Sequence, residues 1–206
     1  MALSNVELWN QSVFLAVNAS ANAPALLIEI AKVLASGAIY LAVLSLTFLW
    51  VRRGRAVRFV LLDATVSALV GLGLAQMIAA IWYHPRPFEI GLGRQLIAHA
   101  AEASFPSDHA TMMFGLAIPL LCAAQTRRWG SIQMLLGLAV AWSRVYLGVH
   151  FPLDMIGALS VAIFASLVVV PAAAGLRRWT YPTLFATYEA SLKALRLPKA
   201  MFPRNL

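Results

Sequence analysis

The chain has 206 residues, of which 61% are hydrophobic and only 12% are charged. A water-soluble domain usually carries about 25% charged residues, so the composition excludes an ordinary soluble domain and favours an integral membrane protein. The formal net charge is +8. Most basic residues lie in short segments between apolar runs, a pattern that is typical of membrane topology and argues against a nucleic-acid partner.

Apolar runs follow one another along most of the chain. Five are long enough, or nearly long enough, to cross a bilayer, which takes about 20 residues of helix. These runs cover residues 24–50, 57–82, 108–125, 131–149 and 154–176. We therefore predict an all-α fold, a polytopic membrane helix bundle with about five transmembrane helices.

The two ends of the chain are predicted to lie on the membrane and not across it. Residues 5–17 are too few to span, and residues 182–197 carry apolar side chains on one face of a helix. Amphipathic helices of this kind lie in the membrane interface. Because no linker or repeat divides the sequence, we expect a single domain over residues 1–206, with its core at 24–176 and interfacial segments at 1–20 and 180–206.

Basic residues indicate which side of the membrane each loop faces. They gather in residues 51–58, 126–130 and 176–179 and in the C-terminal tail, at Lys193, Arg196, Lys199 and Arg204. These regions alternate along the chain and so fall on one side, which the positive-inside rule identifies as the cytoplasm. The N-terminus, residues 83–107 and the turn at 150–154 then face the outer side.

Three polar clusters gather on this outer side, at the ends of predicted helices. They are HPRPF (84–88), FPSDH (105–109) and SRVYLGVHFPLD (143–154). Arg86 and Arg144 each offer a planar, bidentate donor group to a phosphate. A helix that starts at Ser107 presents free backbone N–H groups to an anion. Taken singly, these residues also have ordinary interpretations, as an arginine that reaches lipid phosphates, an interface anchor or a helix cap.

The third cluster contains a candidate nucleophile and a partner for it. Ser143 and His150 are seven residues apart and share a helix face if the helix continues through both. Asp154 follows His150 by four residues, a spacing that lets its carboxylate accept the Nδ1–H of the imidazole. The other ring nitrogen is then free to attack. His109 lies in the first turn of another predicted helix, where it can protonate a leaving oxygen.

These clusters resemble a known set of motifs. RP at 86–87, PSDH at 106–109 and S-R-x5-H-x3-D at 143–154 resemble the three signature motifs of the type-2 phosphatidic-acid phosphatase superfamily. Within it, HPRPF and PSDH resemble the bacitracin-resistance branch of undecaprenyl-diphosphatases. The resemblance extends over residues 25–176 and implies a membrane phosphatase that needs no metal and no cofactor.

The resemblance also implies roles for individual residues. His150 is the expected nucleophile, which forms a phosphohistidine, Asp154 is its orienting partner, and His109 is the general acid. The residues expected to bind phosphate are Arg86, Ser107 and Arg144, and those expected to make secondary contributions are Asp108, Ser143 and His84.

One position departs from the family pattern. The family's first motif has a lysine seven residues before the arginine, where this chain has Ala79. Lys32, in the first apolar run, is a candidate replacement in the phosphate site. An ion pair with Glu29, or a side chain that reaches water, is the alternative interpretation of a lysine inside the membrane. His84 and Arg94 are further candidates.

The function implied by the resemblance is hydrolysis of undecaprenyl diphosphate to undecaprenyl phosphate and phosphate. It would take place at the periplasmic face of the bacterial inner membrane, with the C-terminus in the cytoplasm, and would recycle the lipid carrier for peptidoglycan synthesis and give bacitracin resistance. The expected partners are this lipid and the bilayer. The alternatives are a phosphatase of phosphatidylglycerophosphate, diacylglycerol diphosphate or lipid A, and a non-enzymatic lipid transporter. Transporter sites usually lie near the membrane midplane, whereas these clusters gather at one face.

Overall fold

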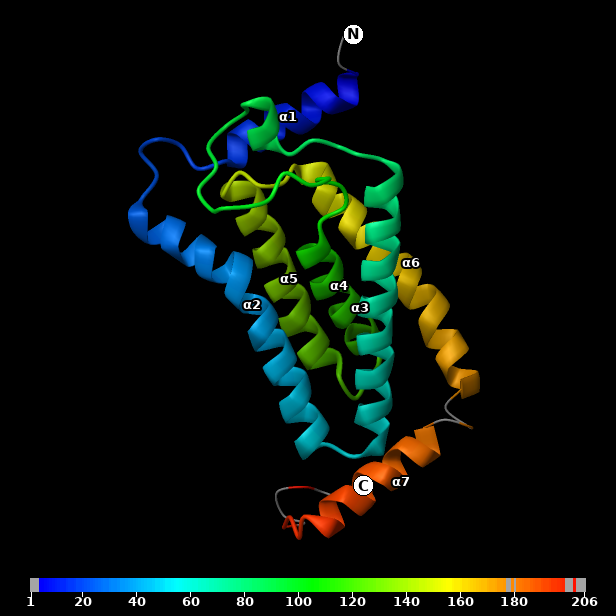
Figure 1. Ribbon diagram of the computed structural model, residues 1–206. Helices are drawn as coiled ribbons and strands as arrows, with labels where there is room; N and C mark the ends of the chain where they lie inside the picture. The colour runs from blue at the N-terminus through cyan, green and yellow to red at the C-terminus, as the bar shows by residue number, and fades with distance from the viewer. Residues whose placement is uncertain (1–3, 177–178, 180, 199–201, 203–206) are drawn as a thin grey trace.

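The computed structural model describes residues 4–176, 179, 181–198 and 202, and within them the chain is helical and contains no strand. The helices are α1 (Asn5–Val17), α2 (Ala25–Arg52), α3 (Arg55–Ile81), the short 3-10 helix η1 (Pro87–Ile90), α4 (Asp108–Cys122), α5 (Arg127–Tyr146), α6 (Pro152–Leu176) and α7 (Tyr181–Ala194) (Figure 1). The predicted all-α bundle is thus confirmed. Part of the predicted orientation rested on residues outside the described ones, namely Arg177, Arg178, Lys199 and Arg204.

Three helices among the described residues are long and apolar enough to cross a membrane. They are α2 with 28 residues, α3 with 27 and the first 24 residues of α6. The sequence predicts about five such helices, but α4 has only 15 residues and α5 carries arginines at both ends. α4 lies at the centre of the bundle, packed against α3, α5 and α6 (Figure 1). A helix enclosed by other helices does not need a lipid-facing surface of full membrane length, because protein covers it.

Small residues let α3 and α4 approach closely. A Cβ atom at Gly115 of α4 would lie 2.7 Å from Cα of Ala68 and 3.2 Å from its Cβ. Glycine and alanine at such positions allow two helix backbones to pack in direct contact. The contact holds α4, whose first residues are Asp108 and His109, directly beside α3.

Two helices lie across the ends of the bundle (Figure 1). α1 crosses the end where α5 stops and α6 begins, and its buried Phe14 packs edge-on against Phe151, with ring centroids 5.3 Å apart. α7 crosses the opposite end, where Glu189 pairs with Arg55 of α3 at 2.9 Å. The two terminal helices therefore lie at opposite ends of the bundle, and their position in the membrane interface stays a prediction.

Candidate active site

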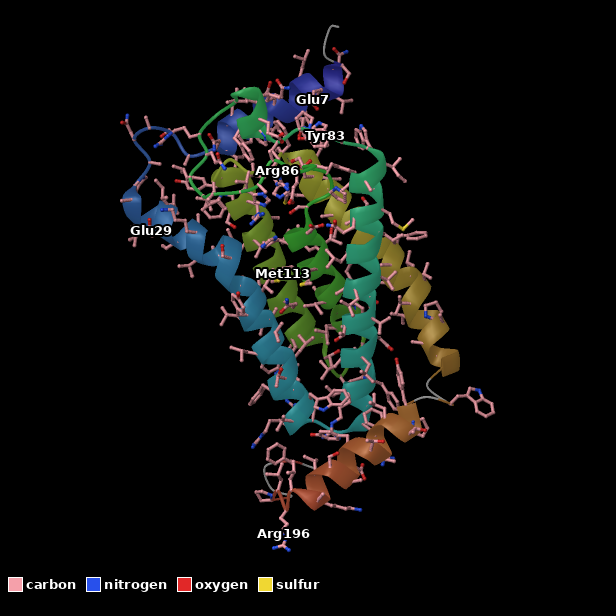
Figure 2. All side chains as sticks on the ribbon, viewed as in Figure 1. Glu7, Glu29, Tyr83, Arg86, Met113 and Arg196 are labelled. Atoms are coloured by element: carbon pink, nitrogen blue, oxygen red, sulfur yellow. The ribbon has the colours of Figure 1, made fainter. Side chains whose placement is uncertain are left out.

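The end of the bundle beside α1 holds a cavity of about 480 Å³. Its walls come from the last turns of α3, the segment 82–107, the start of α4, the end of α5 and the α5–α6 loop. Figure 2 shows Arg86 and Tyr83 at this end of the molecule. The structure brings together five of the predicted site residues as cavity-lining side chains, namely Arg86, Asp108, His109, Arg144 and His150.

His150 lies in the loop between α5 and α6 and is held by Asp154. Nδ1 of the imidazole lies 3.1 Å from Oδ2 of Asp154, in the first turn of α6. The same oxygen accepts hydrogen bonds from the backbone N–H of Phe151 at 2.7 Å and from the hydroxyl of Ser104. Because a carboxylate only accepts, Nδ1 carries the proton and Nε2 keeps its lone pair.

Ser143 does not share a helix face with His150, so this part of the sequence prediction was wrong. α5 ends at Tyr146, and the chain then turns through Gly148, whose φ of +81° suits glycine. The Ser143 hydroxyl is buried and donates to the carbonyl of Val140 at 2.8 Å. It does not line the cavity. The helical register that relates the two residues stops before His150.

Arg86 joins two loops beside His150. Its guanidinium donates at 3.0–3.2 Å to three backbone carbonyls, those of Glu102, Ala103 and Val149. Its Nη1 also lies 3.0 Å from Nε2 of His150, and because a guanidinium can only donate, the Nε2 lone pair accepts this hydrogen bond. The buried arginine therefore both fixes the loops and points at the atom expected to attack.

Arg144 reaches the cavity from the last turn of α5, and one of its N–H donors is unpaired among the described residues. Its Nη2 lies 2.8 Å from Nε2 of His99. Its Nε is buried and has no hydrogen-bond partner among the described residues. A buried N–H without an acceptor costs free energy, so the arrangement favours an acceptor that the protein itself does not supply.

The surroundings of His150 set its charge. The side chain is 2% exposed. Burial lowers the pKa of His150 well below its usual value, and the positive charges of Arg86 and Arg144 lower it further. The imidazole is therefore neutral at neutral pH, and Nε2 can act as a nucleophile once Arg86 directs its N–H groups to a bound anion.

The start of α4 also faces the cavity. Ser107 is the N-cap residue, but its side chain makes no capping hydrogen bond, and its buried hydroxyl has no partner among the described residues. Asp108 accepts a hydrogen bond of 2.7 Å from Gln76 of α3, and His109 lines the cavity. The first turn of a helix offers free N–H groups and a positive dipole end, which favour an anion here.

The cations considered as replacements at Ala79 lie elsewhere. Lys32 pairs with Glu29 at 2.8 Å, and Figure 2 places Glu29 on the part of α2 that leans away from the bundle. The predicted phosphate-binding role of Lys32 is therefore corrected in favour of the ion pair. His84 faces α1, and Arg94 donates to backbone carbonyls of the α1–α2 loop. None of the three lines the cavity, whereas Ala79 does.

Three residues that contribute to this end of the bundle carry no signal in the sequence that would mark them as site residues. His99 and Ser104 come from residues 91–107, which contain no helix or strand. Their positions depend on hydrogen bonds from Arg86 to the neighbouring carbonyls of Glu102 and Ala103, which no periodicity in the sequence reveals. The third residue is Asn10 of α1.

Asn10 supports the helix that carries Asp154. Its side chain is 1% exposed, and its Oδ1 accepts a hydrogen bond of 3.1 Å from the backbone N–H of Leu153. N–H groups in the first turn of a helix have no partner within that helix. Asn10 therefore caps α6 from another helix, directly before the residue that holds His150.

Asn10→Ala is expected to lower kcat several-fold with little change in KM. Loss of a cap costs about 1 kcal/mol and loosens the turn that positions Asp154, while Arg86 and Arg144 stay in place. Steady-state kinetics on the purified protein measures both constants. Ser12→Ala is the matched control, because the Ser12 hydroxyl is exposed and bonds only within α1. An unchanged kcat in Asn10→Ala would show that the first turn of α6 holds its position without this cap.

Comparison with known proteins agrees with this geometry. Residues 60–178 match the PAP2 superfamily. The chain is 36% identical over 163 residues to YbjG of Escherichia coli (strain K12), which is named provisionally as an undecaprenyl-diphosphatase, covering 79% of this chain and 81% of that protein. It is 32% identical over 154 residues to the undecaprenyl-diphosphatase BcrC of Bacillus subtilis (strain 168), covering 75% and 79%. The fold resembles the crystal structure of Aquifex aeolicus LpxE, with a TM-score of 0.68 and 22% identity over 83% of this chain and 99% of that one. The match over more than half of the chain shows that this protein belongs to the PAP2 superfamily.

Proposed function

We propose that this protein hydrolyses undecaprenyl diphosphate to undecaprenyl phosphate and phosphate at the periplasmic face of the bacterial inner membrane. The observation that carries the proposal is the geometry of His150, whose Nδ1 is bound to Asp154 and whose Nε2 faces the guanidinium of Arg86. Similarity to proteins named as undecaprenyl-diphosphatases supports the choice of substrate. Recycling of the lipid carrier for cell-wall synthesis and resistance to bacitracin would follow from this activity.

In the first step, Nε2 of His150 attacks the terminal phosphorus of the substrate. A P–N bond forms while the bond from phosphorus to the bridging oxygen breaks, and the lipid monophosphate leaves with that electron pair. Arg86 and Arg144 donate to the oxygens of the transferred phosphoryl group. Burial, with the charge of Arg144, lowers the pKa of His109 to about 4 in the empty cavity, so His109 takes a proton from solvent when the anionic headgroup enters. It then gives that proton to the leaving oxygen, and Asp154 stabilises the positive charge that develops on the imidazole of His150.

In the second step, water attacks the phosphorus of the phosphohistidine. The P–N bond breaks, inorganic phosphate leaves, and Nε2 of His150 regains its lone pair. His109, which gave up its proton in the first step, accepts one from the attacking water. Both histidines return to their starting states.

The cavity suits a phosphate headgroup and leaves a long hydrocarbon chain outside. Its volume of about 480 Å³ lies in the range of small-ligand sites. Gln76, Ala80 and Tyr83 border it on one side, and all three are exposed on the outer surface of the bundle. They lie in or just after the last turns of α3, a helix long and apolar enough to span a membrane. The lipid chain can therefore remain in the bilayer while the headgroup enters.

Phosphate release by the purified protein tests the proposal. Undecaprenyl diphosphate, phosphatidylglycerophosphate, diacylglycerol diphosphate and lipid A are compared at equal mole fraction in one detergent. We expect the highest kcat/KM with undecaprenyl diphosphate, together with inhibition by vanadate, which mimics a five-coordinate phosphorus. A clear preference for another lipid would contradict the substrate. No vanadate-sensitive release from any of them would contradict the phosphatase and favour a lipid transporter.

The end of the bundle that holds the cavity is expected to face the periplasm, because the basic loops lie at the other end. The single cysteine, Cys122, is first replaced with serine. Single cysteines are then placed within residues 89–100 and within residues 126–130, and intact cells are treated with a membrane-impermeant thiol reagent. We expect labelling within 89–100 and not within 126–130. The opposite pattern would reverse the orientation.

Activity is expected to persist as the pH is lowered from about 8 to about 6.5. Because the pKa of His150 is lowered, its neutral form persists down to that lowered value and is lost only when the pH falls below it. The acid limb of kcat/KM, which reports the free enzyme, should therefore lie below the ordinary range of histidine. A limb centred at or above that range would mean that the nucleophile is not in the environment described for His150.

A further inference from the structure

A diphosphate headgroup places two phosphates near the cavity, and the steps above account for the binding of one. The position that carries a lysine in the family pattern is Ala79, and no lysine among the described residues lines the cavity. The second phosphate therefore lacks a cationic partner among the residues used so far. His99 lines the same cavity and takes no part in those steps.

His99 lies within reach of a headgroup held at His150. The two imidazole ring centroids are 6.1 Å apart, and the rings are inclined at 79°. A phosphorus atom poised for attack lies about 3–3.5 Å from the attacking nitrogen. In-line displacement puts the leaving phosphate on the far side of that phosphorus from His150, inside the cavity whose wall includes His99.

Two hydrogen bonds define the state of His99 when no anion is bound. Its Nδ1 lies 3.1 Å from the carbonyl oxygen of Ala100, which can only accept, so Nδ1 carries the proton. Its Nε2 lies 2.8 Å from Nη2 of Arg144, which can only donate, so Nε2 is the acceptor. His99 is therefore neutral, and it occupies a donor of Arg144 that a phosphate would use.

The charges around His99 make its protonation depend on whether an anion occupies the cavity. Burial lowers the pKa of His99, and the guanidinium groups of Arg86 and Arg144 lower it further, against the hydrogen bond to Ala100 and the charge of Glu102. A bound diphosphate brings several negative charges to the same space and would raise that pKa. The other titratable side chains that line the cavity are Tyr83, Asp108, His109 and His150.

Given the proposed hydrolysis of a lipid diphosphate, we propose that His99 recognises the second phosphate, the one that stays with the lipid. When the headgroup enters, Arg144 turns from His99 to the terminal phosphate. The freed Nε2 takes a proton from the solvent, and the imidazolium donates Nε2–H to the second phosphate. His99 thereby supplies the cation that is absent at Ala79 and favours a diphosphate over a monophosphate.

Calorimetric titration of the full-length protein in detergent tests this assignment with two inorganic probes, methylene diphosphonate and orthophosphate. His99→Gln keeps an acceptor for Arg144 but cannot become charged. We expect this variant to bind methylene diphosphonate about tenfold more weakly, as loss of a charge-assisted hydrogen bond implies, and to bind orthophosphate with little change. The thermal midpoint of each variant is measured alongside to verify folding.

Proton uptake gives a readout that a purely structural role would not affect. Binding enthalpies measured at pH 7 in two buffers with different heats of ionisation give the number of protons taken up. Wild-type protein should take up more protons with methylene diphosphonate than His99→Gln does, and ionisation of the probe itself cancels in the comparison. His99→Lys, which carries a fixed charge, should retain affinity for methylene diphosphonate without the additional proton.

The outcomes separate this assignment from the proposed function. Equal proton uptake by wild type and His99→Gln, or equal loss of affinity for both probes, would overturn it and leave His99 as a residue that only positions Arg144. Wild-type protein that binds methylene diphosphonate with His99-dependent proton uptake but hydrolyses no lipid diphosphate would refute the proposed function and leave the recognition role of His99 in place.

Discussion

Replacement of His150 with alanine is expected to lower kcat by on the order of 10³-fold or more, because no covalent phosphoenzyme can form. Arg86 and Arg144 remain, so the variant should still bind vanadate or phosphate. Phosphate release under saturating substrate measures the loss. Rapid quenching at alkaline pH, where a phosphohistidine survives, should trap labelled wild-type protein and no labelled variant.

Two further variants test whether Asp154 and Ser143 contribute to the activity of His150. Asp154→Asn is expected to lose less activity than His150→Ala, since the imidazole is present but no longer held with its proton on Nδ1. Ser143→Ala should stay close to wild type, because its hydroxyl bonds to the carbonyl of Val140 and lies outside the cavity. Hydrolysis by His150→Ala at near the wild-type rate would remove the phosphohistidine mechanism altogether.

Replacement of His109 with alanine is expected to affect two classes of substrate differently. With a diphosphate, the leaving oxygen belongs to a second phosphate, whose second pKa is about 6, so it leaves at neutral pH with little help. With a phosphomonoester, the leaving group is an alkoxide that needs a proton donor. We expect His109→Ala to reduce monoester hydrolysis about tenfold more than diphosphate hydrolysis, within the 10²–10⁴ range of general-acid effects.

The comparison requires kcat/KM for both substrate types in the same detergent. His109 lines the cavity, so loss of phosphate binding is the competing explanation for any drop in activity. That explanation predicts equal losses for the two substrates. Equal losses would therefore remove the general-acid role and leave His109 as a binding residue.

The helical bundle could be predicted because apolar runs of nearly fixed length are what a bilayer requires. The spacing between His150 and Asp154 also gave the correct hydrogen bond, because four residues at a helix start impose a local geometry. The prediction that Ser143 shares a helix face with His150 was wrong. It assumed a helix that in fact ends at Tyr146.

Contacts made by irregular segments could not be predicted. His99 belongs to the irregular segment 91–107. Arg86 holds this segment through two of its backbone carbonyls, and no periodic pattern in the sequence reveals such a contact. Lys32 has a suitable charge, and the sequence left a phosphate-binding role and an ion pair with Glu29 both open. The structure shows the ion pair at 2.8 Å, and Figure 2 places Glu29 on the part of α2 that leans away from the bundle.

The exposed border of the cavity along α3 has a consequence for how catalysis must be measured. If the headgroup enters past Gln76, Ala80 and Tyr83, the substrate arrives by diffusion within one leaflet, and encounters occur in two dimensions. The relevant concentration is then the mole fraction of substrate in the bilayer or micelle. Added inert lipid or detergent should slow the reaction at constant bulk concentration, so a Michaelis constant has meaning for this protein only when it is expressed per unit of surface.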